Sequence, residues 1–455
     1  MTEQTTRALL ADAASRASDY IEDLKTRNVA ADPEAIERLA AALDADLPDG
    51  ASDPAEVLAF VDTFGSPATV GSAGGRYFGF VTGGALPATL ATNSLTTAWD
   101  QNSFSFVSSP AAAKFEEAAL RWVKQALGLP MQAGGALVTG ATMANFTGLA
   151  AARNAVLRRA NWDVDHDGLF GAPEITVYVG EEFHAAVSKV LSMLGLGRDR
   201  VTTLPVDDQG RIRTDNLPQI SGPSILCLQA GNVNSGAFDP ADELIPWAHD
   251  GGAWVHVDGA FGLWALASDE LLDQAAGYVE ADSWATDAHK WLNVPYDSGI
   301  LIVRDEAALG QAMALSGAYL FQSDHRDAMD FTPESSRRAR AIDVWAALKS
   351  LGRAGLAGMF ERHCRQARRL AEALAAEDGI EVRNEVNLNQ VVVTFGDTDR
   401  TNQVIARVQA DGDCWAGGTV WQGHTAMRLS VSSWITTDED IERSIAAILR
   451  VHREI

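Results

Sequence analysis

Lys290 and Asp258 are the two residues whose setting points most directly to covalent chemistry. Lys290 lies within Asp287-Ala288-His289-Lys290-Trp291, beside a histidine and among apolar residues. A lysine amine that is desolvated in this way can form an imine with a carbonyl compound, whereas an exposed lysine stays charged and is a poor nucleophile. Asp258 ends the apolar run Trp254–Val257. A buried carboxylate at that place needs a partner that is charged or donates hydrogen bonds.

The protonated nitrogen of a pyridine ring would be such a partner for Asp258. A ring held protonated by a carboxylate withdraws electrons from a substrate joined to it. A lysine that can form an imine, Lys290, and a carboxylate that can pair with a ring nitrogen, Asp258, together indicate an enzyme that uses pyridoxal phosphate (PLP). Taken singly, each has an alternative: an exposed lysine whose stem covers apolar surface, and an aspartate that caps a helix or forms a salt bridge.

Two other places in the chain fit the same cofactor. The stretch Val138–Asn145 joins an expected strand to an expected helix, and its small residues Ala141 and Thr142 would let backbone N–H groups approach a phosphate. His184 begins a helix after a strand, where an imidazole can stack on a planar ring and exchange protons. The alternatives are a capped strand-to-helix turn and a capping or core histidine.

The elements that must position these residues alternate between strand and helix over residues 73–318. Short apolar runs bounded by Gly or Asp predict strands, and Thr142–Arg159 predicts a helix. The expected strands are Ala136–Val138, Ile175–Val179, Val201–Val206, Ile225–Gln229, Trp254–Val257 and Ile300–Val303. Such alternation predicts an α/β fold, with a mainly parallel sheet covered by helices on both faces. We expect residues 73–318 to form a large cofactor-binding domain.

The two ends of the chain follow other patterns. Residues 6–64 show helical spacing, and Asp32-Pro33 opens a second helix, so residues 1–72 are expected to form a helical N-terminal arm. Residues 319–455 are expected to form a small α+β C-terminal domain. This domain begins with a long helical stretch, Ala339–Ala375, and includes the strands Val391–Phe395 and Met427–Val431.

Composition limits the classes of partner. The formal net charge is −25 and the isoelectric point is near 4.7, which argues against nucleic acid and anionic membrane surfaces. Solubility explains this acidity, and a salt-rich habitat is a second explanation. The three cysteines form no CxxC pair, and no apolar run reaches the roughly 18–20 residues that span a bilayer. A cytoplasmic protein is therefore expected.

The chemical residues occur in an order that is similar to a known family. Gly140-Ala141-Thr142, His184, Asp258 and Lys290 follow one another as in the group II PLP-dependent amino-acid decarboxylases. These include the aromatic-amino-acid, glutamate and diaminobutyrate decarboxylases. The similarity runs from Arg76-Tyr77-Phe78 to Ala426-Met427-Arg428. The motifs that carry it are Gln229–Asp239, His256-Val257-Asp258-Gly259-Ala260 and Asp287–Trp291.

The resemblance implies a role for each matching residue. Lys290 would carry the Schiff base and Asp258 would pair with the pyridine nitrogen. Ala260 would pack beneath the ring, while His184 would stack on its other face. Asn232 would lie near the cofactor and the reacting centre. The residues that would contact the phosphate are Ala141, Thr142 and His289. An enzyme with all of these residues would convert an L-amino acid to its amine and CO₂.

The resemblance also implies a type I PLP-dependent (aspartate-aminotransferase-like) fold and a homodimer with active sites at its interface. The N-terminal arm would wrap the partner subunit. Arg428 matches an arginine that holds the substrate carboxylate in some relatives. Phe80 stands where glutamate decarboxylases tend to have glutamine. Together with Tyr77, Val81 and Trp99, it predicts a pocket for an aromatic or apolar side chain.

One stretch departs from the family pattern. Relatives carry a tyrosine on a mobile loop that helps to protonate the product carbanion, whereas Phe321–Phe331 looks shorter and has no tyrosine. His184 or His325 would take this role, and His325 is also a candidate substrate-binding residue. Otherwise oxygen would intercept the carbanion and the product would be an aldehyde. A more distant alternative is a PLP-binding protein without catalysis.

A calcium loop competes for one acidic segment. Asp163-Val164-Asp165-His166-Asp167-Gly168, followed by Glu174, matches the EF-hand pattern. Glu174 leads into the β-type run Ile175–Val179, where an EF-hand needs its second helix. An acidic surface turn is the alternative, and we expect no metal.

Overall fold

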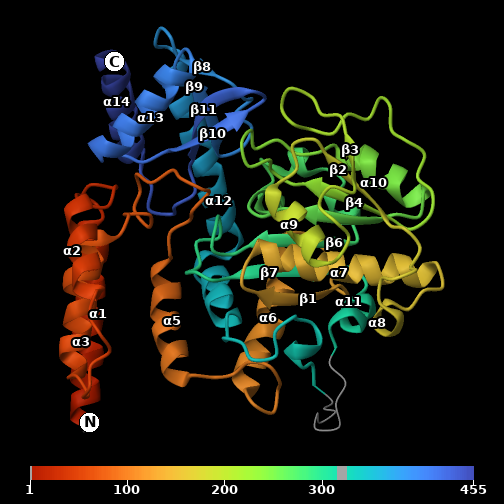
Figure 1. Cartoon of the computed structure of the whole chain (residues 1–455), viewed down its shortest axis with the longest axis horizontal. Coiled ribbons are helices and arrows are strands. Elements are labelled where there is room, and N and C mark those ends of the chain that lie inside the picture. Colours follow the sequence, from red (N-terminus) through yellow and green to blue (C-terminus); the bar gives the residue numbers. More distant parts are fainter. Residues whose placement is uncertain (1–2, 315–324) are drawn as a thin grey trace. The chain divides into compact units, whose positions relative to one another are not determined.

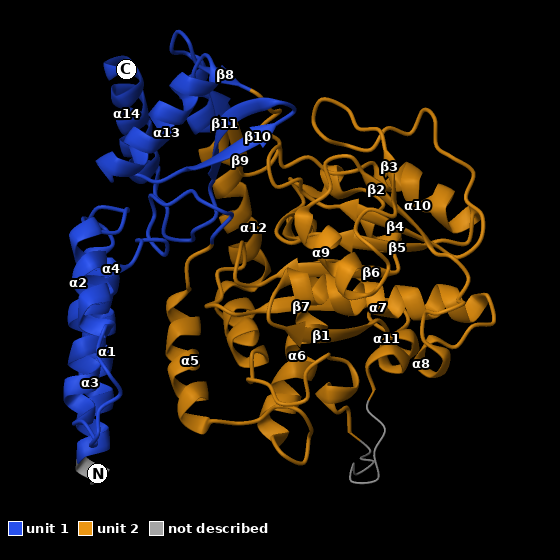
Figure 2. Ribbon diagram, viewed as in Figure 1, with its two compact units in different colours: residues 1–82, 369–382, 393–455 blue, residues 83–368, 383–392 orange. Residues whose placement is uncertain are grey.

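The computed structural model describes residues 3–314 and 325–455 and divides the chain into two compact units (Figures 1 and 2). One unit contains residues 83–368 and 383–392. The other contains residues 1–82, 369–382 and 393–455. The division into an arm and two domains that we expect from the sequence stays a prediction. None of the described helices is long and apolar enough to cross a membrane.

A seven-stranded sheet, counted over the described residues, forms the centre of unit 83–368/383–392. Its order is β1-β7-β6-β5-β4-β2-β3. The strands are β1 (Gly134–Val138), β2 (Thr176–Gly180), β3 (Val201–Leu204), β4 (Ser224–Gln229), β5 (Trp254–Asp258), β6 (Ser283–Asp287) and β7 (Gly299–Val303). The pairs from β6 to β3 are parallel, while β7 is antiparallel to both β6 and β1. The predicted α/β class with a mainly parallel sheet is confirmed.

Helices cover this sheet and supply much of its core. The α-helices of this unit before α12 are α5 (Pro87–Trp99), α6 (Pro110–Ala126), α7 (Ala141–Arg159), α8 (Val164–Asp167), α9 (Ala185–Met193), α10 (Ala241–Asp250) and α11 (Glu306–Met313), and α6, α7, α10 and α11 contact strands of the sheet. Helix α7 packs on β5, β6 and β7, and its buried Leu149 joins a core with Val179, Ile225 and Leu301. Burial of these aliphatic side chains fixes α7 against the sheet, and therefore fixes the turn that precedes it.

The strand ends explain where a site can form. In register, Gln229 of β4 lies opposite Asp258 of β5, and β6 ends at Asp287. Parallel strands end at the same edge of a sheet, and an open α/β sheet binds its ligands at the carboxyl ends of its strands. Three polar residues that end neighbouring strands are therefore brought to one edge.

The long helix α12 (Ala341–Ala375) starts in unit 83–368/383–392 and ends in unit 1–82/369–382/393–455. It contains a kink at Gly352, where φ is +59°. A four-stranded sheet has the order β10-β11-β9-β8. Its strands are β8 (Glu381–Val382), β9 (Gln390–Thr394), β10 (Gly417–Trp421) and β11 (His424–Ser430). This small sheet and its helices confirm the predicted α+β region.

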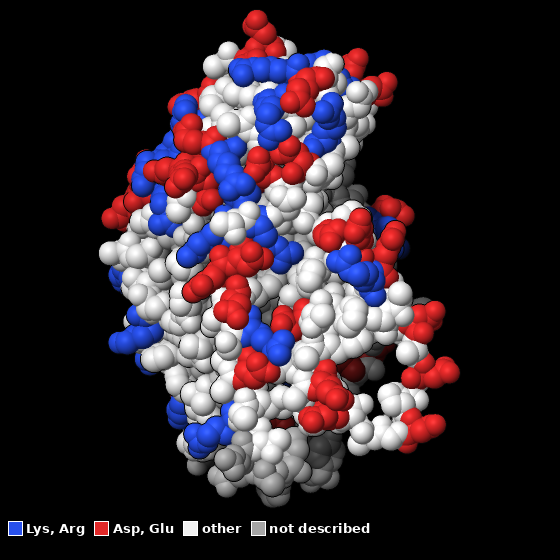
Figure 3. All heavy atoms as spheres, turned by 90° about the vertical axis from the view of Figure 1, so that its left-hand side faces the viewer, with Lys and Arg blue, Asp and Glu red and all other residues white. Residues whose placement is uncertain are grey.

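The remaining α-helices belong to unit 1–82/369–382/393–455. They are α1 (Glu3–Asp23), α2 (Pro33–Leu43), α3 (Pro54–Phe60), α4 (Ser66–Ala68), α13 (Thr398–Asp411) and α14 (Asp438–Glu454). Asp32 caps α2 through the Glu34 N–H, as Asp32-Pro33 predicts. Figure 3 shows acidic and basic side chains mixed on one face.

Candidate active site

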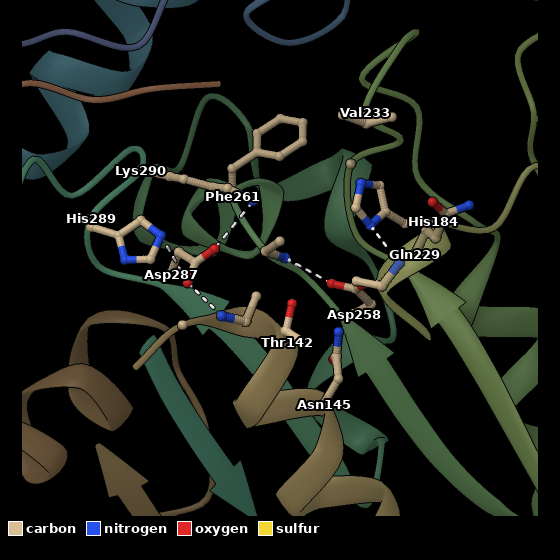
Figure 4. A pocket seen from close by; sticks show the side chains of 15 residues that line it. Thr142, Asn145, His184, Gln229, Val233, Asp258, Phe261, Asp287, His289 and Lys290 are labelled. Atoms are coloured by element: carbon tan, nitrogen blue, oxygen red, sulfur yellow. Dashed lines mark hydrogen bonds and ion pairs between the residues drawn. The ribbon is translucent and has the colours of Figure 1, made fainter. Parts of the chain in front are cut away.

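A cavity of about 250 Å³ lies where β4, β5 and β6 end and α7 begins, close to the lower end of the usual volume of ligand pockets (Figure 4). Residues far apart in the sequence line it. Those that the sequence predicts as site residues are Ala141, Thr142, His184, Asp258, Ala260, His289 and Lys290. The fold therefore brings most of the expected cofactor-binding residues to one cavity within one unit.

The lysine side of this cavity consists of Lys290, Asp287 and His289. Lys290 Nζ lies 3.1 Å from Asp287 Oδ2, and the Asp287 side chain is only 3% exposed. The other carboxylate oxygen of Asp287 accepts the Ala141 N–H at 2.6 Å, at the start of α7. A carboxylate at the N-terminus of a helix is stabilised by the unpaired N–H groups and the helix dipole. Asp287 thus joins the lysine to the phosphate-binding turn that we expect at this helix.

His289 completes the lysine side as a neutral donor. Its Nδ1 accepts the Ser298 N–H at 3.0 Å, so the proton of a neutral ring lies on Nε2. That nitrogen is 3.4 Å from Asp287 Oδ1. Burial lowers the pKa of His289, which favours the neutral form. Tyr296 stacks on the ring with centroids 4.3 Å apart and holds it in place.

The aspartate side of the cavity consists of Asp258, Asn145 and His184. Asp258 is 6% exposed, and its Oδ1 accepts the Ala260 N–H at 3.2 Å. Asn145 belongs to α7, is fully buried and lines the cavity. In Figure 4 its amide nitrogen points toward Asp258. His184 caps α9 by accepting the Ala186 N–H at Nδ1 (3.1 Å), so the proton of the neutral ring lies on Nε2.

These residues fit a cofactor that has a ring nitrogen and a phosphate. A Cβ added to Gly140 would lie 3.1 Å from His289 Cε1, so glycine keeps the turn before α7 open beside the histidine. Asn145 Nδ2 is buried without a hydrogen-bond partner among the described residues. A buried donor of this kind is costly unless a hydrogen-bond acceptor reaches it when the cavity is occupied. The cavity thus offers an anion site at one side and polar groups for a ring at the other.

Three predicted residues of the same unit do not line the cavity. Asn232 is 2% exposed, and its Oδ1 accepts the Asn234 N–H at 2.8 Å, so the side chain shapes the loop after β4. Trp99 ends α5 and is 40% exposed. The His325 ring lies against that of Phe106, with centroids 3.7 Å apart and planes tilted by 30°. Their predicted roles stay predictions, and residues 321–324 of the predicted loop lie outside the described residues.

The other predicted substrate residues belong to unit 1–82/369–382/393–455. Tyr77 stacks on Trp415 with centroids 5.0 Å apart, and Phe80 lies 5.5 Å from the same ring. Phe80 is 65% exposed, whereas Val81 is buried. Arg428 belongs to β11, and burial lowers its pKa. Tyr77, Phe80 and Trp415 form an aromatic cluster, and the assignment of Arg428 to a substrate carboxylate stays a prediction.

The acidic segment that matches a calcium loop has other contacts. Asp163 caps α8, and Asp165 accepts a hydrogen bond from Asn154 at 2.9 Å. Glu174 pairs with Arg200 at 2.5 Å. Within residues 3–314 and 325–455, no group of three or more His, Cys, Asp or Glu residues could hold a metal ion. The segment therefore has the contacts of an acidic surface turn.

Sequence reasoning assigned no role to Asp287, Asn145 or Gln229, although all three line the cavity. Gln229 and Asp287 had a signal available, since each is a polar residue that ends a strand. Asn145 follows Thr142 by almost one helical turn, so it lies on the same face of α7. The partner of its Oδ1, however, is His256 of β5, which no local pattern could reveal.

Comparison with known proteins finds one matching family model and several relatives. Residues 42–395 match the family model described as the pyridoxal-dependent decarboxylase conserved domain. An aromatic-L-amino-acid decarboxylase of Bacillus atrophaeus is 27% identical over 87% of this chain and 85% of its own length. A phenylacetaldehyde synthase of Arabidopsis thaliana is 25% identical over 75% of this chain and 74% of its own length.

The fold has close counterparts among solved structures. The structure titled Oryza sativa TDC with PLP and tryptamine has a TM-score of 0.91 and 22% identity, covering 100% of this chain and 99% of that one. Likeness at this identity shows the fold alone, and it confirms the predicted fold class, with a large mainly parallel sheet and a small α+β region.

Proposed function

This chain belongs to the pyridoxal-dependent decarboxylase family, and on that premise we propose that it removes CO₂ from an L-amino acid with an aromatic or apolar side chain. The cofactor is PLP and the enzyme is a carboxy-lyase of amino acids. The observation that carries the proposal is the meeting of Lys290, Asp258 and His184 in one cavity beside the first turn of α7.

The residues divide the work according to their surroundings. When bound, PLP supplies a ring that takes up the electron pair left behind as CO₂ departs. Lys290 would hold the cofactor covalently and give way to the substrate amine. Asp258 would keep the ring nitrogen protonated by pairing with it. The first turn of α7, with Ala141 and Thr142, and the Nε2–H of His289 would hold the phosphate.

Loss of CO₂ leaves an electron pair at Cα, and one proton must be added there to give the amine. His184 would deliver that proton from Nε2 in its imidazolium form, since a neutral imidazole is too weak an acid, and Nδ1 would first release the Ala186 N–H and take up a proton from solvent. His325 is the second candidate of the sequence.

The aromatic cluster supports the substrate class. Phe80 exposes 65% of its surface beside Trp415, which gives an apolar face rather than the amide that would bind a second carboxylate. The relative from Bacillus atrophaeus is named for aromatic amino acids. An aromatic ring that packs on such a face contributes about 0.5–1.5 kcal/mol beyond its buried area.

A substrate panel tests this proposal. PLP-loaded enzyme is incubated with L-tyrosine, L-tryptophan, L-phenylalanine, L-glutamate and L-2,4-diaminobutyrate, and CO₂ and amine are measured by mass spectrometry. We expect an aromatic amino acid to have a kcat/KM at least about tenfold above that of glutamate, a difference of about 1.4 kcal/mol. Preference for glutamate would contradict the proposed pocket.

An aldehyde is the second candidate product. A phenylacetaldehyde synthase is among the relatives, and no tyrosine occurs in Phe321–Phe331. In that reaction the substrate, O₂ and water give the aldehyde, CO₂, ammonia and hydrogen peroxide. Peroxide and aldehyde formed in equal amounts during the substrate panel would favour this product over the amine.

We also propose a homodimer with active sites at its interface. The N-terminal helices expose large apolar side chains that suit burial against a second copy. They are Leu10, Ile36, Leu43, Val57 and Val61, each 48–62% exposed. Light scattering that gave the mass of one chain would contradict this proposal. The cytoplasmic location expected from the sequence stays a prediction.

A further inference from the structure

A buried chain of polar side chains leads from the sheet to the cavity. Trp254 Nε1 donates to Ser283 Oγ at 2.9 Å, and Ser283 Oγ lies 2.7 Å from His256 Nδ1. His256 Nε2 lies 2.9 Å from Asn145 Oδ1. None of the four side chains is more than 2% exposed. Four polar groups with so little access to water are costly unless each is satisfied by the next.

The donor and acceptor properties of these four side chains fix the direction of the hydrogen bonds between them. An indole N–H can only donate, so Ser283 Oγ accepts from Trp254, and its own proton is directed to His256 Nδ1. His256 then carries its proton on Nε2 and donates to Asn145 Oδ1. Burial lowers the pKa of His256 to about 4, so the ring is neutral at pH 7. The reverse order would give the Ser283 hydroxyl proton no acceptor within the chain.

This order turns the amide of Asn145 so that its nitrogen faces the cavity. Asn145 Nδ2 points toward Asp258 in Figure 4 and has no hydrogen-bond partner among the described residues. Oδ1 of Asp258 accepts the Ala260 N–H at 3.2 Å. A further N–H donor to this carboxylate would stabilise its charged form. The charged form is the one that holds a ring nitrogen protonated.

We propose that Asn145 is a positioning residue for the cofactor ring. Its amide donates to the Asp258 carboxylate in the holoenzyme and holds it ionised and aimed at the pyridine nitrogen. The chain of His256, Ser283 and Trp254 sets the direction of the amide. The inference rests on the proposed role of Asp258, and it assigns a purpose to the histidine of His256-Val257-Asp258, which the proposed function leaves unused.

Two substitutions separate positioning from packing. Asn145→Leu removes both the donor and the acceptor at similar volume. Asn145→Asp keeps an acceptor for His256 but loses the donor that faces Asp258. The matched control is Asn154→Leu, because Asn154 also belongs to α7, is 2% exposed and donates to Asp165, yet does not line the cavity.

The readouts are the dissociation constant for PLP, followed by fluorescence, and the ¹⁵N chemical shift of PLP labelled at the pyridine nitrogen. We expect both Asn145 variants to bind PLP about 10-fold or more weakly, as for loss of one hydrogen bond to a charged group. Their ¹⁵N shift should move toward that of the unprotonated ring. Asn154→Leu should leave the shift unchanged and the dissociation constant within about twofold, since it removes no contact in the cavity.

The Asp258→Asn variant distinguishes failure of the proposed role of Asp258 from failure of the positioning role of Asn145. If this variant leaves the ¹⁵N shift unchanged, the proposed role of Asp258 is wrong. If it moves the shift while the Asn145 variants do not, only the positioning role is wrong. Ser283→Ala leaves Asn145 in place and frees His256, so a shift in the same direction as Asn145→Leu is expected even where the Asn145 variants fold poorly. An unchanged shift in Ser283→Ala would overturn the role of the buried chain.

Discussion

The two sides of the cavity differ in whether their polar groups already have hydrogen-bond or ion-pair partners within the protein. On the lysine side, Lys290 pairs with Asp287, Asp287 accepts the Ala141 N–H, and His289 accepts the Ser298 N–H. On the aspartate side, Asn145 Nδ2 is buried without a partner among the described residues. Cofactor binding must therefore exchange existing contacts on the lysine side, whereas it completes an unfinished network on the aspartate side.

Removing the lysine should have the largest effect. Lys290→Ala leaves no amine in the cavity to hold the cofactor, so we expect turnover to fall by at least about 10⁴-fold, as when a covalent catalyst loses its nucleophile. The visible absorbance of the bound cofactor should disappear as well. Lys189→Ala, which alters an exposed lysine of α9, is the control and should retain full activity. Steady-state activity retained by Lys290→Ala would sink the assignment.

Breaking the ion pair of the lysine side should destabilise the protein without its cofactor. Asp287→Asn leaves the partly buried Lys290 ammonium without its carboxylate, and we expect the free energy of unfolding to fall by about 1–3 kcal/mol. The loss should be smaller in the PLP-loaded protein, because the lysine nitrogen is then engaged by the cofactor. Urea unfolding with and without PLP measures both values. An equal loss in the two states would mean that Lys290 never exchanges this partner.

The aspartate side should respond to acid through His256. Burial lowers its folded-state pKa to about 4, while the unfolded value is about 6.5. Between these values the unfolded chain binds a proton that the folded protein does not, so stability falls as pH falls. Relative to His256→Gln, the wild type should lose up to about 1.4 kcal/mol of unfolding free energy per pH unit from about 6.5 to about 4. If the unfolding free energies of wild type and His256→Gln changed in parallel with pH, folding would not lower the pKa of His256.

The sequence predicted the residues whose signals are local. Asp258 ends β5, the small residues before α7 form the predicted turn, and His184 begins a helix, because each depends on a strand or helix boundary within a few residues. Lys290 was predicted from its neighbours alone. The α/β class followed in the same way from apolar runs that alternate with helical spacing.

The sequence did not reveal contacts that join distant segments. Strand β6 (Ser283–Asp287) was missed, since its polar residues hide the apolar run that marks a central strand, and Asp287 was missed with it. Asn145 and His256 meet only because α7 packs on β5. The short strand β10 was also missed. It starts with two glycines and alternates between partly buried and exposed residues, so it shows no apolar run.

Reduction of the PLP-loaded enzyme with borohydride, followed by peptide mapping with mass spectrometry, tests the central claim most directly. Borohydride fixes the cofactor to the nitrogen that binds it, so the modified residue can be read from the fragment masses. The account predicts a single pyridoxyl group on Lys290, within the peptide that contains Asp287-Ala288-His289-Lys290-Trp291. A pyridoxyl group on another lysine, or none in an active preparation, would contradict it.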